Sequence, residues 1–150
     1  MSKKHNTDVQ QRFLDDVCAL LVPWGMPQMS ARIYGYLLIN SEPQSLDDIA
    51  QGLDVSKSSA SVAARVLEGH MVIRRQAEKG SKRFRYVVCD GSAGLMTAKS
   101  ELLGEFGRLL VDRADSIAAD SAAVRMRAIG RFHLAMREAM AKLVEELGAA

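Results

Sequence analysis

The chain has 150 residues, of which 48% are hydrophobic and 25% are charged, and its formal net charge is +2. This composition is that of an ordinary globular protein, and the length suffices to bury a core without disulfides or metal. The polar first residues argue against a secretory signal, and no run of eighteen apolar residues occurs, so we expect a cytoplasmic protein with no membrane partner.

The positive charge is concentrated in one part of the chain. Residues 55–88 carry eight Lys or Arg and two acids, whereas residues 1–54 and 89–150 are mildly acidic. A localised basic block predicts a surface that binds a polyanion. A solvated basic face would show the same count, so the charge alone does not decide between the two.

Three helices are expected before the basic block. The first should begin at Thr7, whose hydroxyl we expect to accept a capping bond, and should end before Pro23. Apolar residues at helical spacing predict a second helix over residues 28–39. Ser45, with Asp48 three residues later, is typical of the start of a third helix.

The basic block begins with a fourth helical pattern and then changes period. Ser56 is suited to cap a helix over residues 57–68, in which Val62 is among the residues expected to point inward. Alternation with a period of two predicts strands over residues 71–77 and 82–88, joined by a glycine-containing loop. Helix, turn, helix and hairpin in this order predict a winged helix-turn-helix.

Two long amphipathic patterns, around residues 103–117 and 129–147, close the chain. Their apolar stripes exceed what a small core can cover and predict an interface. The expected fold is mainly α with a small β-hairpin wing. Its expected parts are an N-terminal helical arm for dimerisation (1–25), a winged helix-turn-helix (26–89) and C-terminal dimerisation helices (90–150).

A winged helix-turn-helix of this charge is suited to double-stranded DNA. Small side chains at the start of the fourth helix permit close approach to the major groove, and cations at a hairpin tip suit phosphates or the minor groove. The expected DNA contacts are Ser56, Lys57, Ser58, Ser59, Ser61, Arg65, Arg74, Lys79, Lys82, Arg83 and Arg85.

The stretch 25–88 resembles the MarR-type winged-helix regulators, particularly their GbsR-like branch. The matching pieces are Gly25-Met26-Pro27, the segments 33–38, 45–50 and 53–61, and the basic hairpin with Gly80 at its tip. The resemblance implies a homodimer that binds a pseudo-palindromic operator and regulates transcription as a repressor. It also implies a response to a small-molecule effector or to thiol oxidation.

Other functions fit the sequence less well. His5, His70 and His133 are separated from each other and from cysteine, so no metal, cofactor or catalysis is expected. A winged helix that serves as a protein–protein adaptor of a chromosome-organising complex, without specific DNA binding, is the main alternative.

Two further sets of residues bear on regulation. Cys18 and Cys89 are read as reduced thiols, with a redox-sensing pair as the alternative. An aromatic set is expected near the junction of the N-terminal helix with the core, where it would pack or would bind a cationic or apolar effector. Its members are Phe13, Trp24, Tyr34 and Tyr36.

Overall fold

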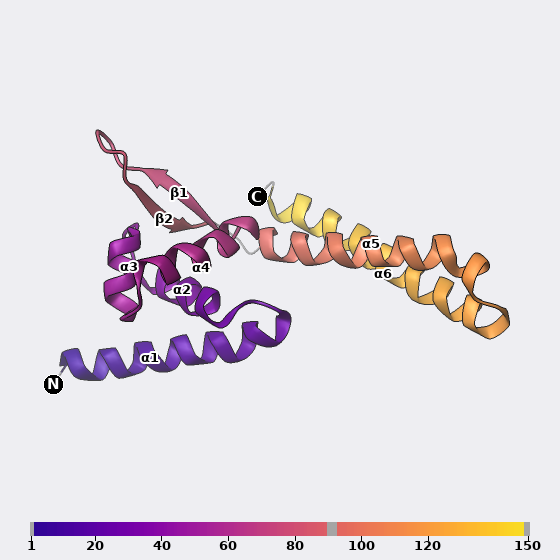
Figure 1. Ribbon diagram of the computed structural model, residues 1–150, viewed down its shortest axis with the longest axis horizontal. Helices are drawn as coiled ribbons and strands as arrows, with labels where there is room; N and C mark the ends of the chain where they lie inside the picture. Colours follow the sequence, from indigo (N-terminus) through magenta and orange to yellow (C-terminus); the bar gives the residue numbers. More distant parts are fainter. Residues whose placement is uncertain (1, 90–92, 149–150) are drawn as a thin grey trace. The chain divides into compact units, whose positions relative to one another are not determined.

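The computed structural model describes residues 2–89 and 93–148. Two compact units make up the chain, Met1–Asp90 (unit 1) and Gly91–Ala150 (unit 2). The described residues are mostly helical, with one two-stranded hairpin in unit 1 (Figure 1). The expected fold class, mainly α with a small β wing, is confirmed.

The N-terminal helix α1 spans Ser2–Leu21 and is followed by the short 3₁₀ helix η1, Val22–Trp24. Helix α1 ends before Pro23, as predicted. It begins at Ser2, five residues before Thr7, so the predicted capping box at Thr7 is wrong. The side chains of Leu14 and Cys18 are buried. A Cβ at Gly35 of the next helix would lie 2.9 Å from Leu14 Cδ2, so glycine there permits the close approach of α1.

Three helices form the helix-turn-helix core: α2, Gln28–Ile39; α3, Leu46–Leu53; and α4, Lys57–Gly69. They pack through fully buried Ile33, Ile49 and Leu67, one from each helix. The buried hydroxyl of Ser30 donates to the Ala63 carbonyl of α4 at 3.1 Å, which satisfies the polar group inside the core. Asp54, with a φ of 54°, makes the tight left-handed turn between α3 and α4.

The predicted capping box at the start of α3 is confirmed. Ser45 Oγ accepts from the Asp48 N–H at 3.0 Å, while Asp48 Oδ2 accepts from the Ser45 N–H at 2.9 Å. These bonds hold the pKa of the Asp48 carboxyl below its usual range, mainly because the Ser45 backbone N–H stabilises its charged form, with the Ser45 side chain and Arg85 adding to the effect.

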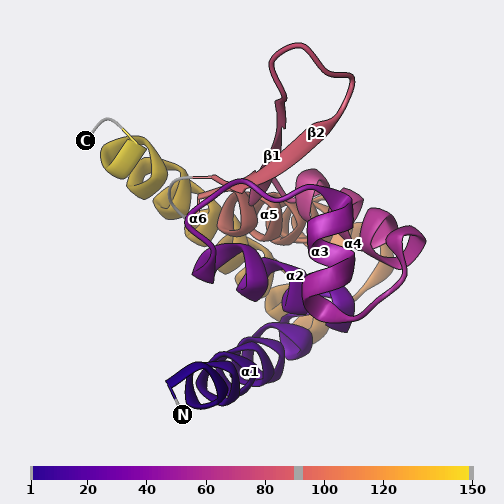
Figure 2. The ribbon, with the colours of Figure 1, turned by 90° about the vertical axis from the view of Figure 1, so that its left-hand side faces the viewer.

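The wing is an antiparallel pair of strands, β1 (Ile73–Ala77) and β2 (Phe84–Val88), that extends away from helices α2–α4 (Figure 2). Both strands are two residues shorter than expected. Met71, with a φ of 58°, belongs to the turn that ends α4, and the Glu78 N–H donates to the Arg83 carbonyl at 3.1 Å within the loop.

The base of the wing is tied to the helix-turn-helix by its backbone. Gln44 and Tyr86 exchange two hydrogen bonds, N–H to carbonyl at 3.1 Å and 2.7 Å, so the connection before α3 adds a bridge to the edge of β2. The buried Tyr86 ring lies at the same position. The orientation of the hairpin on the core is therefore fixed at this point.

Unit 2 consists of α5 (Ala93–Ile117) and α6 (Asp120–Gly148), which run antiparallel along each other (Figure 1). A Cβ at Gly107 would lie 2.7 Å from the Gly130 carbonyl oxygen, and a Cβ at Gly130 would lie 2.6 Å from that of Gly107. The two helices are thus in backbone contact where they cross. A bidentate pair between Arg137 and Glu101 joins them elsewhere, at 2.9 Å.

Candidate nucleic-acid interface

Helix α4 starts with a cap that occupies two of the predicted contact residues. Ser56 Oγ accepts from the Ser59 N–H at 3.1 Å and lies 2.8 Å from Ser59 Oγ. Ser58 Oγ is 3.2 Å from the same Ser56 oxygen. The hydroxyls of Ser56 and Ser59 therefore hold the beginning of the helix, and they offer less to an external partner than the sequence suggested.

The outward face of α4 carries short or basic side chains. Lys57, Ser58 and Arg65 are exposed and Ser61 is half-buried, while the opposite face is buried through Ala60, Ala63, Ala64 and Leu67. Val62 was expected to point inward, and this is wrong, because its side chain is 62% exposed. Small alanines fill the space against the core, so the larger valine lies outside.

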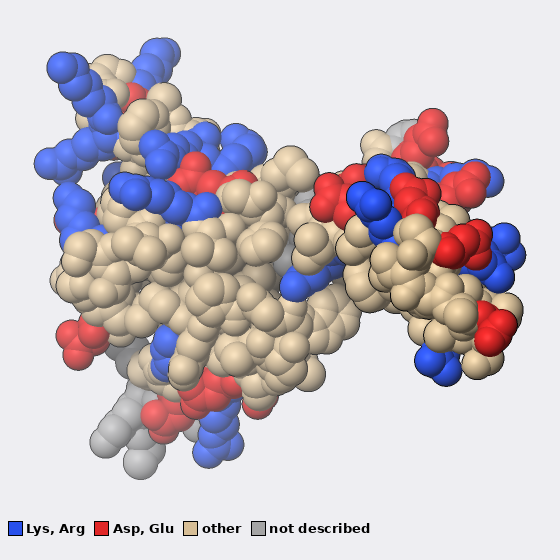
Figure 3. Space-filling view, turned by 45° about the vertical axis from the view of Figure 1, so that its right-hand side comes forward, with Lys and Arg blue, Asp and Glu red and all other residues tan. Residues whose placement is uncertain are grey.

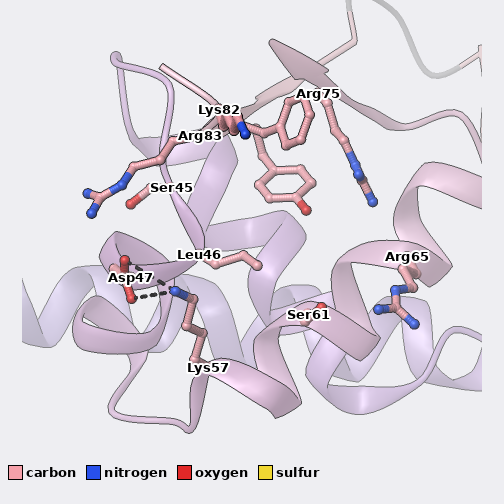
Figure 4. A pocket seen from close by; sticks show the side chains of 11 residues that line it. Ser45, Leu46, Asp47, Lys57, Ser61, Arg65, Arg75, Lys82 and Arg83 are labelled. Atoms are coloured by element: carbon pink, nitrogen blue, oxygen red, sulfur yellow. Dashed lines mark hydrogen bonds and ion pairs between the residues drawn. The ribbon is translucent and has the colours of Figure 1, made fainter. Parts of the chain in front are cut away.

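A groove of about 290 Å³ lies between the start of α3, the outer face of α4 and the wing (Figure 4). Five cationic side chains and a single carboxylate line it, alongside small, apolar and aromatic side chains. These residues are Ser45, Leu46, Asp47, Lys57, Ser61, Arg65, Arg75, Lys82, Arg83, Phe84 and Tyr86. The structure thus brings predicted contacts from α4 and from the wing into one concave surface with an excess of positive charge.

The single carboxylate of the groove is already paired. Asp47 Oδ1 lies 3.3 Å from Lys57 Nζ, and both side chains are mostly exposed (Figure 4). An exposed pair of this kind contributes about 1 kcal/mol or less. A polyanion can therefore displace Asp47 from Lys57 at small cost.

Two of the arginines in the wing are held by acids of the helix-turn-helix. Arg75 of β1 binds both carboxylate oxygens of Glu68 in α4, at 3.1 Å and 3.0 Å, and lies over the Phe84 ring at 5.4 Å. Arg85 of β2 lies 3.3 Å from Asp48 Oδ2 and 3.5 Å from Glu78 Oε1. These arginines anchor the wing to α3 and α4. The sequence did not indicate this role, because each acid and its arginine lie on different elements.

The remaining wing cations face outward. Arg74, Lys79, Lys82 and Arg83 are exposed, and none has an ionic partner among the described residues. Lys and Arg side chains gather over the hairpin and the adjoining helices of unit 1 (Figure 3). The eleven predicted contact residues therefore divide into outward groups on α4 and the wing, two capping serines, and the anchored Arg85.

The four aromatic residues proposed for an effector lie on several elements. Phe13 on α1 and Trp24 on η1 are exposed. The Tyr36 hydroxyl donates to Gln44 Oε1 at 3.0 Å, next to α3, whereas Tyr34 has Cys89 among the groups around it. Burial raises the pKa of both tyrosines. Tyr34 and Tyr36 thus extend toward different parts of unit 1, and effector binding by this set stays a prediction.

Both cysteines are free thiols. Cys18 is buried, with its Sγ 3.7 Å from the Gln28 carbonyl oxygen, and Cys89 is half-buried directly after β2. No group of His, Cys, Asp and Glu in residues 2–89 and 93–148 is arranged to hold a metal ion. Within the same ranges, every helix is too short or too polar to cross a membrane.

Comparison with known proteins places the fold. No family model and no curated protein matches the chain. A solved structure described as a transcriptional regulator is 20% identical, with a TM-score of 0.81, over 94% of this chain and 99% of that one. A lower similarity is found to a Staphylococcus aureus MepR–DNA complex, with 15% identity and a TM-score of 0.46 over 98% of both chains. It is also found to a MarR protein from Peptoclostridium difficile, with 11% identity and a TM-score of 0.45 over 93% of this chain and 90% of that one. The chain therefore shares the winged helix-turn-helix fold of the first of these structures.

Proposed function

We propose that this protein binds double-stranded DNA in a sequence-specific manner and regulates transcription. The observation that carries the proposal is the cation-rich groove formed by α3, α4 and the wing, with the thin outer face of α4 along one side. An α-helix fits the major groove, about 12 Å wide, only if its outer side chains permit close approach. Ser58 and Ser61 meet that condition.

The two elements have different tasks in this proposal. Arg65, just over two turns into α4, extends to a guanine edge or to a phosphate, and Ser58 and Ser61 bond to base edges. Lys82 and Arg83 beside the hairpin tip bind phosphates or enter the minor groove, which adds affinity without reading sequence. The anchors Arg75 and Arg85 hold the wing at the angle that these contacts require.

The fold supports the same function. The similar structure with a TM-score of 0.81 is described as a transcriptional regulator. Together with the resemblance of residues 25–88 to MarR-type regulators, this favours a repressor that acts in the cytoplasm by occupying an operator. A response to a small effector through Phe13, Trp24, Tyr34 or Tyr36 is part of the proposal, and so is the GbsR-like assignment.

We further propose that the protein acts as a homodimer. In unit 2, the residues between the helices are small, such as Gly107, Ala114 and Gly130, and large apolar side chains lie on the outside, such as Leu109 and Phe132. Large apolar side chains gathered on the outside of a protein usually mark an interaction surface. A second copy would cover it with matching residues, and two-fold symmetry would suit a pseudo-palindromic operator.

Selection of bound duplexes from a random library tests the function. We expect enrichment of an inverted repeat whose halves are centred roughly 34 Å apart, one helical turn, or a multiple of that distance. If no sequence is enriched and the protein does not bind DNA below about 100 mM salt, where phosphate contacts are strong, the function is wrong. The adaptor alternative would then be favoured.

A further inference from the structure

The exposed valine of the recognition helix has no role in the folded unit. Val62 is 62% exposed and shares the outward face of α4 with Ser58, Ser61 and Arg65, at the spacing i, i+3, i+4, i+7. The core side of the helix is completed by alanines and Leu67. The packing of unit 1 therefore does not explain an apolar side chain at position 62.

Helix stability does not explain it either. Valine is β-branched and loses χ1 freedom in a helix, so it is a poorer helix former than alanine or a long polar residue. An exposed apolar side chain also gains nothing from burial in the folded unit. Position 62 thus carries a residue that suits neither an exposed helix position nor a solvent-facing surface, and such conflicts between local preference and structure are expected mainly at functional sites.

The surroundings of Val62 indicate what covers it. Val62 does not itself line the groove, but Arg65, three residues further along the same face of α4, lines it together with Lys57, Arg75, Lys82 and Arg83. A surface with this charge fits a polyanion and disfavours an apolar protein partner. Val62 is thus an exposed apolar side chain beside a surface that suits a highly charged occupant.

Double-stranded DNA offers an apolar group in this setting. Base edges in the major groove present hydrogen-bond donors and acceptors, with one apolar exception, the C5-methyl group of thymine. We infer that Val62 contacts a thymine methyl and so specifies an A·T pair within each half-site. The inference rests on the proposed DNA-binding function, and it adds a specificity residue that the pattern of cations and serines did not indicate.

Deoxyuridine provides a direct test, because it pairs as thymine does but lacks the methyl group. The probe is the duplex selected from an unmethylated random library, so that thymine is the sole source of C5-methyl groups, with each thymine replaced in turn by deoxyuridine. Burial of one methyl group contributes about 0.8 kcal/mol, so we expect wild-type affinity to fall about fourfold at the contacted position.

Val62→Ala changes both subunits of the dimer and removes both methyl contacts, so it should bind the thymine duplex about fifteenfold more weakly than the wild type and should be insensitive to the deoxyuridine replacement. Its free energy of unfolding should equal or exceed that of the wild type, because alanine is the better helix former. The matched control is Val124→Ala, which removes an equally exposed valine (59%) from α6 and should keep the wild-type ratio of affinities for the two duplexes.

The outcomes separate the inference from the function on which it rests. Loss of deoxyuridine sensitivity in Val62→Ala, with sensitivity kept in Val124→Ala, supports the contact. A wild-type protein that selects a sequence but tolerates every deoxyuridine replacement overturns the contact and leaves DNA binding intact, as does a Val62→Ala variant that stays sensitive. If no duplex is selected, the contact and the proposed function are both wrong.

Discussion

The two units of this protein differ in which residues they bury. In unit 1, large residues such as Ile33, Ile49 and Leu67 are fully buried, although others such as Leu20 and Trp24 stay exposed, and Lys and Arg side chains gather over the hairpin and its surroundings. In unit 2, glycine and alanine lie between the helices, and Leu109 (56% exposed) and Phe132 (62% exposed) lie outside. Unit 1 therefore has a core of large residues within one chain, whereas unit 2 has an apolar outer surface that a second chain would cover.

The largest expected effect concerns the outer surface of unit 2. Leu109→Glu and Phe132→Glu should each weaken self-association at least about a hundredfold, because burying an unpaired carboxylate costs several kcal/mol. Sedimentation or light scattering across a concentration series measures the change. Ser121→Glu, at an exposed polar position of α6, should keep the wild-type state. A wild-type protein that is monomeric at micromolar concentration would contradict the dimer.

The next effect concerns the interior of unit 2. Gly107→Ala or Gly130→Ala should lower the free energy of unfolding by about 1–3 kcal/mol, because the new Cβ would meet backbone that has little room to move. Urea unfolding measures the decrease. Gly69→Ala is the matched control, since its Cβ would meet nothing within 4 Å, and it should cause no decrease. Equal stability of all three variants would show that the helices do not pack at this crossing.

A smaller effect is expected in unit 1, at the cap of α3. Ser45→Ala should lower the free energy of unfolding by about 0.5–2 kcal/mol. The lowered pKa of Asp48 stabilises the fold above the usual range of an aspartic acid, about pH 4, and this contribution disappears as the pH falls through the folded value. Asp48→Asn should remove that dependence, as measured by urea unfolding at several pH values, and the neighbouring Asp47→Asn should retain it. The cap would have no such role if both variants kept the wild-type profile.

The sequence predicted best what depends on neighbouring residues. Ser45 with Asp48, and Ser56 before α4, located two helix starts because a cap bonds within one turn. The predicted helix start at Thr7 was wrong for the same reason, because a local capping signature does not show whether the helix already begins before it. Val62 was placed wrongly because the valines of α4 suggested the core, whereas the alanines fill it.

Contacts between elements could not be predicted in this way. The pairs Arg75–Glu68 and Arg85–Asp48 join residues of the wing to α4 and α3, and one of their cations, Arg85, was predicted from the sequence as a DNA contact. The groove likewise requires three elements to meet. In unit 2, the apolar period indicated two amphipathic helices, but only the backbone contact of Gly107 with Gly130 showed that small residues form the inner seam.

The central claim is that unit 1 binds DNA, with α4 reading sequence and the wing supplying charge. Its most direct test is a salt titration of the wild type, Arg65→Ala and Arg83→Ala on the selected duplex and on random DNA. We expect Arg65→Ala to lose discrimination between the two duplexes. Arg83→Ala should weaken binding to both equally and should reduce the slope of log affinity against log salt by about 0.9 for each phosphate that the variant no longer binds. If Arg83→Ala abolishes discrimination while Arg65→Ala weakens both duplexes equally, the roles are reversed, and if none of the proteins binds DNA, the claim is wrong.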